Sequence, residues 1–124
     1  MELGAFSLSL NVKDIQASKA FYQKIGFEII GGNEIEKWLI LKNEDKIIGL
    51  FEGMLEKNML TFNPKWNAKC ETIESAPDVR ELQKKFQESG INIIDGADPN
   101  STGPASFMIE DPDGNPILFD QHAE

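Results

Sequence analysis

The chain has 124 residues, of which 40% are hydrophobic and 27% charged, and its net charge is −9. This length allows one compact domain, or two small modules that share a core, without a disulfide or a structural metal. The acidic balance argues against nucleic acid as a partner, while the single cysteine and the lack of a signal pattern or a long apolar run predict a cytoplasmic protein without a membrane partner.

The chain begins with a predicted strand and a predicted helix. Residues 5–12 alternate between apolar and small polar side chains, which is the period of a half-buried strand. Asp14 then stands at an N-cap position, and Gly26 at a position that ends a helix. The apolar stripe between them comprises Ile15, Ser18, Tyr22 and Ile25, widened by Phe21.

Three more strands are predicted in the first half. Residues 27–30, which are apolar except for Glu28, predict a strand, and Gly31 opens the turn that follows it. Residues 35–41 and 46–52 predict a hairpin around residues 43–45.

The second half begins in the same order. Residues 59–63 predict a strand, and residues 65–77 carry no clear signal. Asp78, with Glu81 three positions later, predicts a capped helix whose apolar stripe is Val79, Leu82 and Phe86. Gly90 ends this helix, and residues 91–94 predict a strand.

A hairpin closes the chain. The sequence Asp-Pro-Asp-Gly-Asn at residues 111–115 is a strong turn signal between the apolar runs 107–109 and 117–119.

The two halves align as an internal repeat. Residues 26–30 match residues 90–94 at an offset of 64, and the hairpins match at an offset of 68, which places Leu50 with Leu118 and Glu52 with Asp120. A repeat of this kind determines the fold. We expect an α+β domain spanning residues 1–124, built from two βαβββ modules, 5–53 and 58–122, that pair around a central cleft.

The same residues carry a resemblance to a known family. The string Val-x-Asp-x-x-x-Ser-x-x-Phe-Tyr-x-x-x-Gly-Phe, which ends at Phe27, resembles the first-module signature of the vicinal oxygen chelate superfamily. Residues 111–115 resemble the second-module signature of the same superfamily. This superfamily contains glyoxalase I, bleomycin-resistance proteins and extradiol dioxygenases. The resemblance covers nearly the whole chain and implies the fold, but it does not select one chemistry.

The resemblance also implies where a metal would bind. Metal-dependent members supply four His or Glu ligands, from the first and last strands of each module. These positions fall here on Ser7, Leu50, Met59 and Leu118. None offers the imidazole or carboxylate that such metals prefer. We therefore expect no metal and no cofactor, and glyoxalase I chemistry is disfavoured.

The superfamily's ligands bind between the modules, and the resemblance implies the residues that line that cleft. They are Ser7, Ser9, Asn11, Trp38, Ile40, Thr61, Asn63, Trp66, Phe107, Phe119, Gln121 and His122. Aromatic side chains with a few hydroxyls and amides suit a small-molecule site. The same aromatics could instead fill the core, and this alternative stays open.

Three functions follow as hypotheses. The leading one is a metal-independent protein that binds a small molecule in the cleft. The second is a glyoxalase-like lyase or isomerase with a relocated site around His122, with Glu52, Asp120 and Glu110; a histidine so near the chain's end is more often solvated and inert. The third is a structural homodimer that pairs through the edge of strand 5–12.

Overall fold

The computed structural model describes residues 1–124. The chain divides into two compact units, which we call the N-terminal unit (residues 7–59) and the C-terminal unit (residues 1–6 and 60–124). Each contains one helix and part of the strand set, so the α+β class expected from the repeat is confirmed. Neither helix has the length and apolar character that crossing a bilayer requires.

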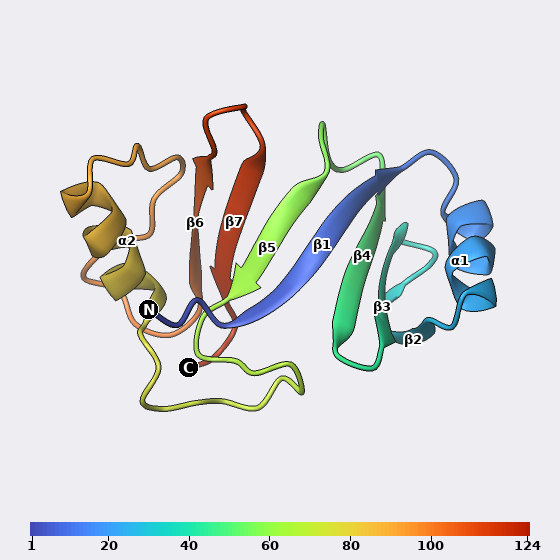
Figure 1. Ribbon diagram of the computed structural model, residues 1–124, viewed down its shortest axis with the longest axis horizontal. Helices are drawn as coiled ribbons and strands as arrows, with labels where there is room; N and C mark the ends of the chain where they lie inside the picture. The colour runs from blue at the N-terminus through green and yellow to red at the C-terminus, as the bar shows by residue number, and fades with distance from the viewer. The chain divides into compact units, whose positions relative to one another are not determined.

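The N-terminal unit is a four-stranded sheet with one helix against it (Figure 1). Its strands lie in the order β2–β3–β4–β1, and β1 is parallel to β4 while the other neighbours are antiparallel. The elements are β1 (Ala5–Val12), α1 (Ile15–Lys24), β2 (Glu28–Asn33), β3 (Trp38–Asn43) and β4 (Lys46–Glu52).

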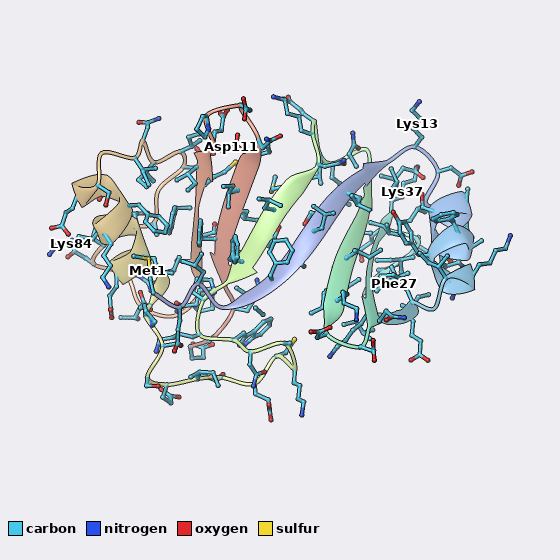
Figure 2. All side chains as sticks on the ribbon, viewed as in Figure 1. Met1, Lys13, Phe27, Lys37, Lys84 and Asp111 are labelled. Atoms are coloured by element: carbon cyan, nitrogen blue, oxygen red, sulfur yellow. The ribbon has the colours of Figure 1, made fainter.

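The core of this unit lies between the sheet and α1. Leu50 on β4 pairs with Leu39 on β3 and with Leu10 on β1, and its side chain is fully buried. The buried cluster comprises Ile15, Leu39, Leu41, Ile48 and Leu50. Phe27, labelled in Figure 2, packs against it from the segment after α1. Because side chains alternate along a strand, Trp38 and Gly49 face away from α1.

The C-terminal unit repeats this plan with one strand fewer. Its elements are β5 (Met59–Asn63), α2 (Val79–Glu88), β6 (Ala105–Glu110) and β7 (Pro116–Gln121). The order is β5–β7–β6, with β5 parallel to β7 and the pair β6–β7 an antiparallel hairpin. Asp111 marks the turn of this hairpin in Figure 2.

Aromatic rings dominate the core under α2. Phe119 stacks on Phe107 with ring centroids 4.9 Å apart and planes 9° apart, and Phe86 from α2 meets both rings edge-on. Val79 and Leu82 complete the helix side of this core and are fully buried. The stripe predicted for α2 is therefore confirmed.

Both predicted helix caps are confirmed. The Asp14 carboxylate accepts hydrogen bonds from the amides of Gln16 and Ala17, at 3.0 and 3.3 Å. Asp78 accepts one from the Arg80 amide at 2.9 Å. These bonds satisfy amides that have no partner within the first turn of a helix.

The strand predicted at residues 91–94 was wrong. Only Ile94 pairs, through two backbone hydrogen bonds with Met108 of 2.7 and 2.9 Å. Pairing stops there because the next residue, Asp95, takes a positive φ of 48°, which a strand cannot contain.

The turn predicted at Gly31 was also misplaced. β2 continues to Asn33 through a bulge near Ile29, and Gly32 approaches β3 so closely that a Cβ there would lie 2.5 Å from the Trp38 carbonyl oxygen. The turn follows instead, because the Asn33 side chain accepts bonds from the amides of Ile35 and Glu36. Ile35 is therefore a turn residue and not part of β3.

Candidate functional site

The candidate site lies on the face of the C-terminal sheet that α2 does not cover, which we call the helix-free face of that unit. Four side chains are connected there. The Asn63 side-chain NH₂ donates to the backbone carbonyl of Asp120 at 2.8 Å, and His122 Nε2 lies 3.3 Å from Asp120 Oδ2. The Trp66 ring stacks on the His122 ring with centroids 4.9 Å apart and planes 17° apart. We call Asn63, Trp66, Asp120 and His122 the Trp–His cluster.

Strand alternation builds one side of this cluster. Phe119 and Gln121 point toward α2, so Asp120 and, beyond the strand end, His122 fall on the other face. The imidazole is half-exposed, at 51%, and the Asp120 side chain is 35% exposed. Both groups are thus accessible to a solute.

A compact loop supplies the other side. The Trp66 amide donates to the Asn63 carbonyl at 3.2 Å, and Trp66 bridges to Thr72. Lys65 adds a backbone bond from the Ile73 amide at 2.6 Å and a side-chain bond to the Glu74 carbonyl at 2.8 Å. These bonds position the indole ring over the end of β7.

The geometry defines what His122 can do. Since Nε2 faces a carboxylate, the neutral imidazole carries its proton on Nε2 and leaves Nδ1 as a hydrogen-bond acceptor. Asp120 orients the ring, and Trp66 offers a flat π surface beside it. This arrangement can bind a planar polar solute by stacking and hydrogen bonding, or it can accept a proton from one.

Five of the expected ligand contacts lie in the N-terminal unit. Ser7, Ser9 and Asn11 project from β1 opposite the apolar Leu8 and Leu10, which pack toward α1. Trp38 shares the face away from α1 with Ile40 and stacks on Phe51, with centroids 6.5 Å apart and planes 5° apart. This helix-free face of the N-terminal unit thus has polar β1 side chains and an aromatic pair. Thr61 is the corresponding polar residue on β5.

Phe107, Phe119 and Gln121 lie on the opposite side, under α2. The two phenylalanines are 1% and 2% exposed, and their rings fill the core, which was the alternative that the sequence left open. Gln121 is 1% exposed, and its amide oxygen accepts from the Val79 amide at 2.8 Å. Its NH₂ donates to Asp78 Oδ1 at 3.0 Å. What the structure shows for these three residues is a role in packing and helix anchoring.

Glu52 has the matching role in the other repeat. Its Oε1 accepts from the Ile15 amide at 2.9 Å, and its Oε2 pairs with Lys37 Nζ at 3.0 Å. The bond from Ile15 and the cation of Lys37 lower the pKa of Glu52. Each helix therefore begins on a side chain from the last strand of its own unit, Glu52 for α1 and Gln121 for α2.

This equivalence corrects the repeat alignment in the last strands. Glu52 corresponds to Gln121, and not to Asp120, so the offset there is 69 rather than 68. Leu50 and Phe119, which both face the helices, obey the same offset. The cause is visible in the turns, because residues 111–115 contain one residue more than the turn at residues 43–46. Comparing the two turn lengths would have revealed the shift.

The corrected offset moves one of the four family metal positions. The counterpart of Leu118 is Gly49, and Leu50 belongs to the core. The Phe51 ring lies over Gly49, where a Cβ would be 2.6 Å from the ring. The four positions are thus Ser7, Gly49, Met59 and Leu118, which do not fit a metal ion. Elsewhere too, no group of three or more His, Cys, Asp or Glu side chains is arranged to hold one.

The turn carboxylates serve local structure. Asp111 accepts from the Asn115 side chain and amide, both at 2.8 Å, and from the Asp113 amide at 2.9 Å. These bonds, led by that of the Asn115 side chain, lower the pKa of Asp111. Asp111 therefore stabilises its turn, as the sequence predicted.

Comparison with known proteins gives a family and a fold. The sequence model described as Glyoxalase/Bleomycin resistance protein/Dioxygenase superfamily matches residues 4–119. No curated protein matches the chain significantly. A superfamily member from Vibrio splendidus 12B01 is similar in structure, with a TM-score of 0.65 and 17% identity over 94% of this chain and 97% of that one.

Two longer proteins, a Mn(II)-bound glyoxalase and a ring-cleaving dioxygenase, share the fold. A Mn(II)-bound glyoxalase from Novosphingobium aromaticivorans aligns with a TM-score of 0.58 and 18% identity over 94% of this chain and 38% of that one. An extradiol ring-cleaving dioxygenase from B. fuscum aligns with a TM-score of 0.59 and 22% identity, over 95% and 32%. At these identities the likeness shows the fold alone.

Proposed function

This chain belongs to the Glyoxalase/Bleomycin resistance protein/Dioxygenase superfamily, and we propose that it is a small-molecule-binding protein that works without a metal ion. The observation that carries the proposal is the set of residues at the four family metal positions, Ser7, Gly49, Met59 and Leu118. A hydroxyl, a glycine, a thioether and a hydrocarbon cannot replace the imidazole and carboxylate ligands that catalytic metals use.

The Trp–His cluster supports binding of a small planar molecule. The Trp66 and His122 rings stack with planes 17° apart, Asp120 Oδ2 lies 3.3 Å from His122 Nε2, and the Asn63 side chain donates to the Asp120 backbone carbonyl. Sites for small molecules combine an aromatic surface with a few placed polar groups. In the N-terminal unit, we separately propose the polar β1 side chains Ser7, Ser9 and Asn11 as ligand contacts.

Binding is tested with a library of small aromatic and heteroaromatic compounds, read by tryptophan fluorescence and calorimetry. A compound that binds wild type should bind Trp66→Ala about ten to a hundred times more weakly, because one stacking contact is lost. Phe21→Ala is the matched control, since it removes an exposed aromatic ring that is not among the proposed ligand contacts. Equal affinity for all three proteins would remove Trp66 from the site.

A separate measurement tests whether binding is independent of a metal ion. The purified protein is incubated with Ni²⁺, Zn²⁺, Mn²⁺ or Fe²⁺, desalted and analysed for bound metal. We expect well below one ion per chain and no change in the affinity for the bound compound. Stoichiometric metal together with lyase or dioxygenase turnover would refute the proposal.

The His122–Asp120 pair favours a second candidate, a lyase or isomerase that uses His122 as a base. Asp120 Oδ2 faces Nε2 and orients the ring, so that Nδ1 can take a proton from a substrate. The assay is isomerisation of the methylglyoxal–glutathione adduct by wild type and His122→Ala. Equal rates would exclude His122 from the mechanism, and inactive wild type would exclude this reaction.

A further inference from the structure

The segment between β5 and α2 is a compact loop that supplies Trp66 to the proposed site. It projects beyond the ends of β5 and β7 in Figure 1. The Asn67 amide donates to the Glu71 carbonyl at 3.0 Å, and the Asn67 side chain bonds to the Glu71 amide and carboxylate. The Ile73 amide donates to the Lys65 carbonyl at 2.6 Å. We call residues 65–75 the Trp66 flap, which can move as one body without breaking these bonds.

Both ends of the Trp66 flap are held by the core. Pro64, which precedes it, is fully buried, and Ala76, which follows it, is 8% exposed. Gly4 lies so close to the first end that a Cβ there would be 2.8 Å from Pro64 Cα. The tip, residues 69–72, is exposed. A segment with internal hydrogen bonds, two fixed ends and a free tip can turn about those ends as about a hinge.

The stacked rings leave no room for a ligand between them. The centroids of Trp66 and His122 are 4.9 Å apart, and their planes differ by 17°. Aromatic rings in direct contact have centroids about 4.5 Å apart or more, so a third ring does not fit in this arrangement. A planar molecule outside the pair can stack on one ring only, whereas a molecule between the rings stacks on both. The second position requires the flap to move away from His122.

The two sides of this gap differ in what holds them. Asp120 and His122 lie at the end of β7, and the Asn63 side chain on β5 donates to the Asp120 carbonyl at 2.8 Å. These groups belong to the sheet and stay in place when the flap moves. Trp66 contacts them through its ring, and an aromatic pair of this kind contributes roughly a two- to tenfold factor to an equilibrium constant. Such a contact closes the flap and still lets it open.

We propose that the Trp66 flap is a hinged lid whose opening forms a slot between Trp66 and His122 for one flat aromatic or heteroaromatic ring. The inference rests on the proposed function, because it describes how the bound molecule reaches both rings of the Trp–His cluster. Asp120 and Asn63 form the fixed polar wall of the slot, and the indole is its moving wall.

Motion of the lid is measured first, without a ligand. Trp38→Phe leaves Trp66 as the single tryptophan, so 5-fluorotryptophan labels the flap alone. Relaxation dispersion of the ¹⁹F signal then gives the population of the open flap and its opening rate. We expect a minor open population that His122→Ala increases roughly two- to tenfold, because the stacked ring is lost.

Glu74→Gln is the matched control for this measurement. It changes a side chain of the flap but keeps the Glu74 backbone carbonyl, which accepts from Lys65 Nζ at 2.8 Å. The open population should therefore equal that of the parent protein. An absence of exchange at Trp66, or an open population that His122→Ala leaves unchanged, would overturn the lid.

The slot is tested with a compound that binds in the fluorescence screen. The compound is mixed rapidly with the same labelled protein at increasing concentrations. If the lid must open first, the observed association rate levels off at the opening rate measured without ligand. A rate that rises linearly beyond this value would show that the compound stacks on the closed pair, and it would overturn the slot.

The lid and the proposed function fail separately. A protein that binds no compound refutes the proposed function and the slot with it, whereas exchange at Trp66 still decides whether the flap opens. A protein that binds a compound tightly but shows no exchange at Trp66 keeps the proposed function and loses the lid.

Discussion

At the scale of single residues, Gln121 shows how a buried polar side chain can anchor an element. Its oxygen holds the Val79 amide, and its NH₂ group contacts Asp78 Oδ1, the Gly103 carbonyl and the Ala123 carbonyl. Both the oxygen and the NH₂ group are hydrogen-bonded, which is the condition under which burying an amide is tolerated.

Gln121→Leu should therefore destabilise the protein more than the loss of one bond suggests. The substitution keeps the volume but leaves the Val79 amide buried without its partner. We expect the free energy of unfolding in urea to fall by about 2–4 kcal/mol. Gln87→Leu, on the exposed side of α2, is the control and should change it by less than about 0.5 kcal/mol. A loss for Gln121→Leu no larger than the control's would contradict this role.

Asp78 makes a pH-dependent contribution to stability. Burial alone would raise the pKa of Asp78, but hydrogen bonds from the Arg80 amide, Gln121 and the Arg80 guanidinium outweigh it, and the pKa is lowered from 3.8. A lowered pKa in the folded state means stability that is present above the unfolded value and lost as the pH falls through the folded value.

Asp78→Asn isolates this contribution. Asparagine still caps a helix, but it cannot titrate. In urea titrations from neutral pH to below about pH 4, wild type should lose more stability than the variant, so the difference between them narrows with acid. A difference that stays constant with pH would show that Asp78 is not the titrating group.

Local signals in the sequence identified some of these residues and not others. Asp14 and Asp78 could be predicted as caps because a cap bonds to amides two or three residues ahead. Gln121 and Glu52 could not, since each reaches a helix about forty positions away in the sequence. The Trp66–His122 pair is similar, because only the bend after Asn63 and the end of β7 bring the two rings together.

At the scale of elements, the two repeats use different side chains to bond the first amide of their helix. The first amide of α1 bonds to the carboxylate of Glu52, and that of α2 bonds to the carboxamide of Gln121. A carboxylate adds a favourable interaction with the positive end of the helix dipole and pairs with Lys37 in this case.

Glu52→Gln gives the first repeat the carboxamide acceptor that Gln121 provides in the second. The acceptor for the Ile15 amide remains, so the variant should fold and keep most of its stability at neutral pH. Because the pKa of Glu52 is lowered in the folded state, wild type loses this contribution in acid and the variant should not. Glu52→Leu, which removes the acceptor, should be the less stable variant in thermal melts at neutral pH. Equal melting temperatures for the Gln and Leu variants would refute the anchoring role.

Element prediction succeeded where periodicity and caps agreed. The strands 5–12, 46–52 and 59–63 have the predicted bounds, and both helices lie between their predicted caps. The stripe predicted for α1 was wrong at Phe21 and Ile25, which are exposed. It failed at residues 91–94, where three isoleucines suggested a strand but Ile93 packs against the core without strand pairing. It failed at β2 because two consecutive glycines, usually a turn signal, allow a bulged strand to approach β3 closely.

At the scale of the whole molecule, strand β1 belongs partly to each of the two units. Ala5 and Phe6 group with the C-terminal unit, and the rest of the strand groups with the N-terminal unit. Gly4, just before β1, has a positive φ of 91°. It also lies so near the Asn63 carbonyl that no side chain would fit. The repeat in the sequence predicted two similar halves, but it could not show that the first residues group with the second half.

A strand that continues through both units should make them unfold together. Residues 7–59 make up the N-terminal unit and residues 1–6 with 60–124 the C-terminal unit; an isolated core of either size is marginal, so neither unit is expected to survive the loss of the other. Trp38 lies in the N-terminal unit and Trp66 in the C-terminal unit, and each can serve as the only fluorescent reporter. Urea unfolding of Trp66→Phe, which reports on Trp38, and of Trp38→Phe, which reports on Trp66, should each coincide with the transition followed by circular dichroism in the same protein.

Core substitutions make this test stricter. Leu50→Ala opens a cavity in the N-terminal core and Leu82→Ala in the C-terminal core, each at a fully buried position, and each should cost about 2–5 kcal/mol. If unfolding is cooperative, either substitution shifts the Trp38 and the Trp66 signals by the same amount. If Leu50→Ala shifts only the Trp38 signal and Leu82→Ala only the Trp66 signal, the units fold independently, and the division of β1 between them does not couple their stability.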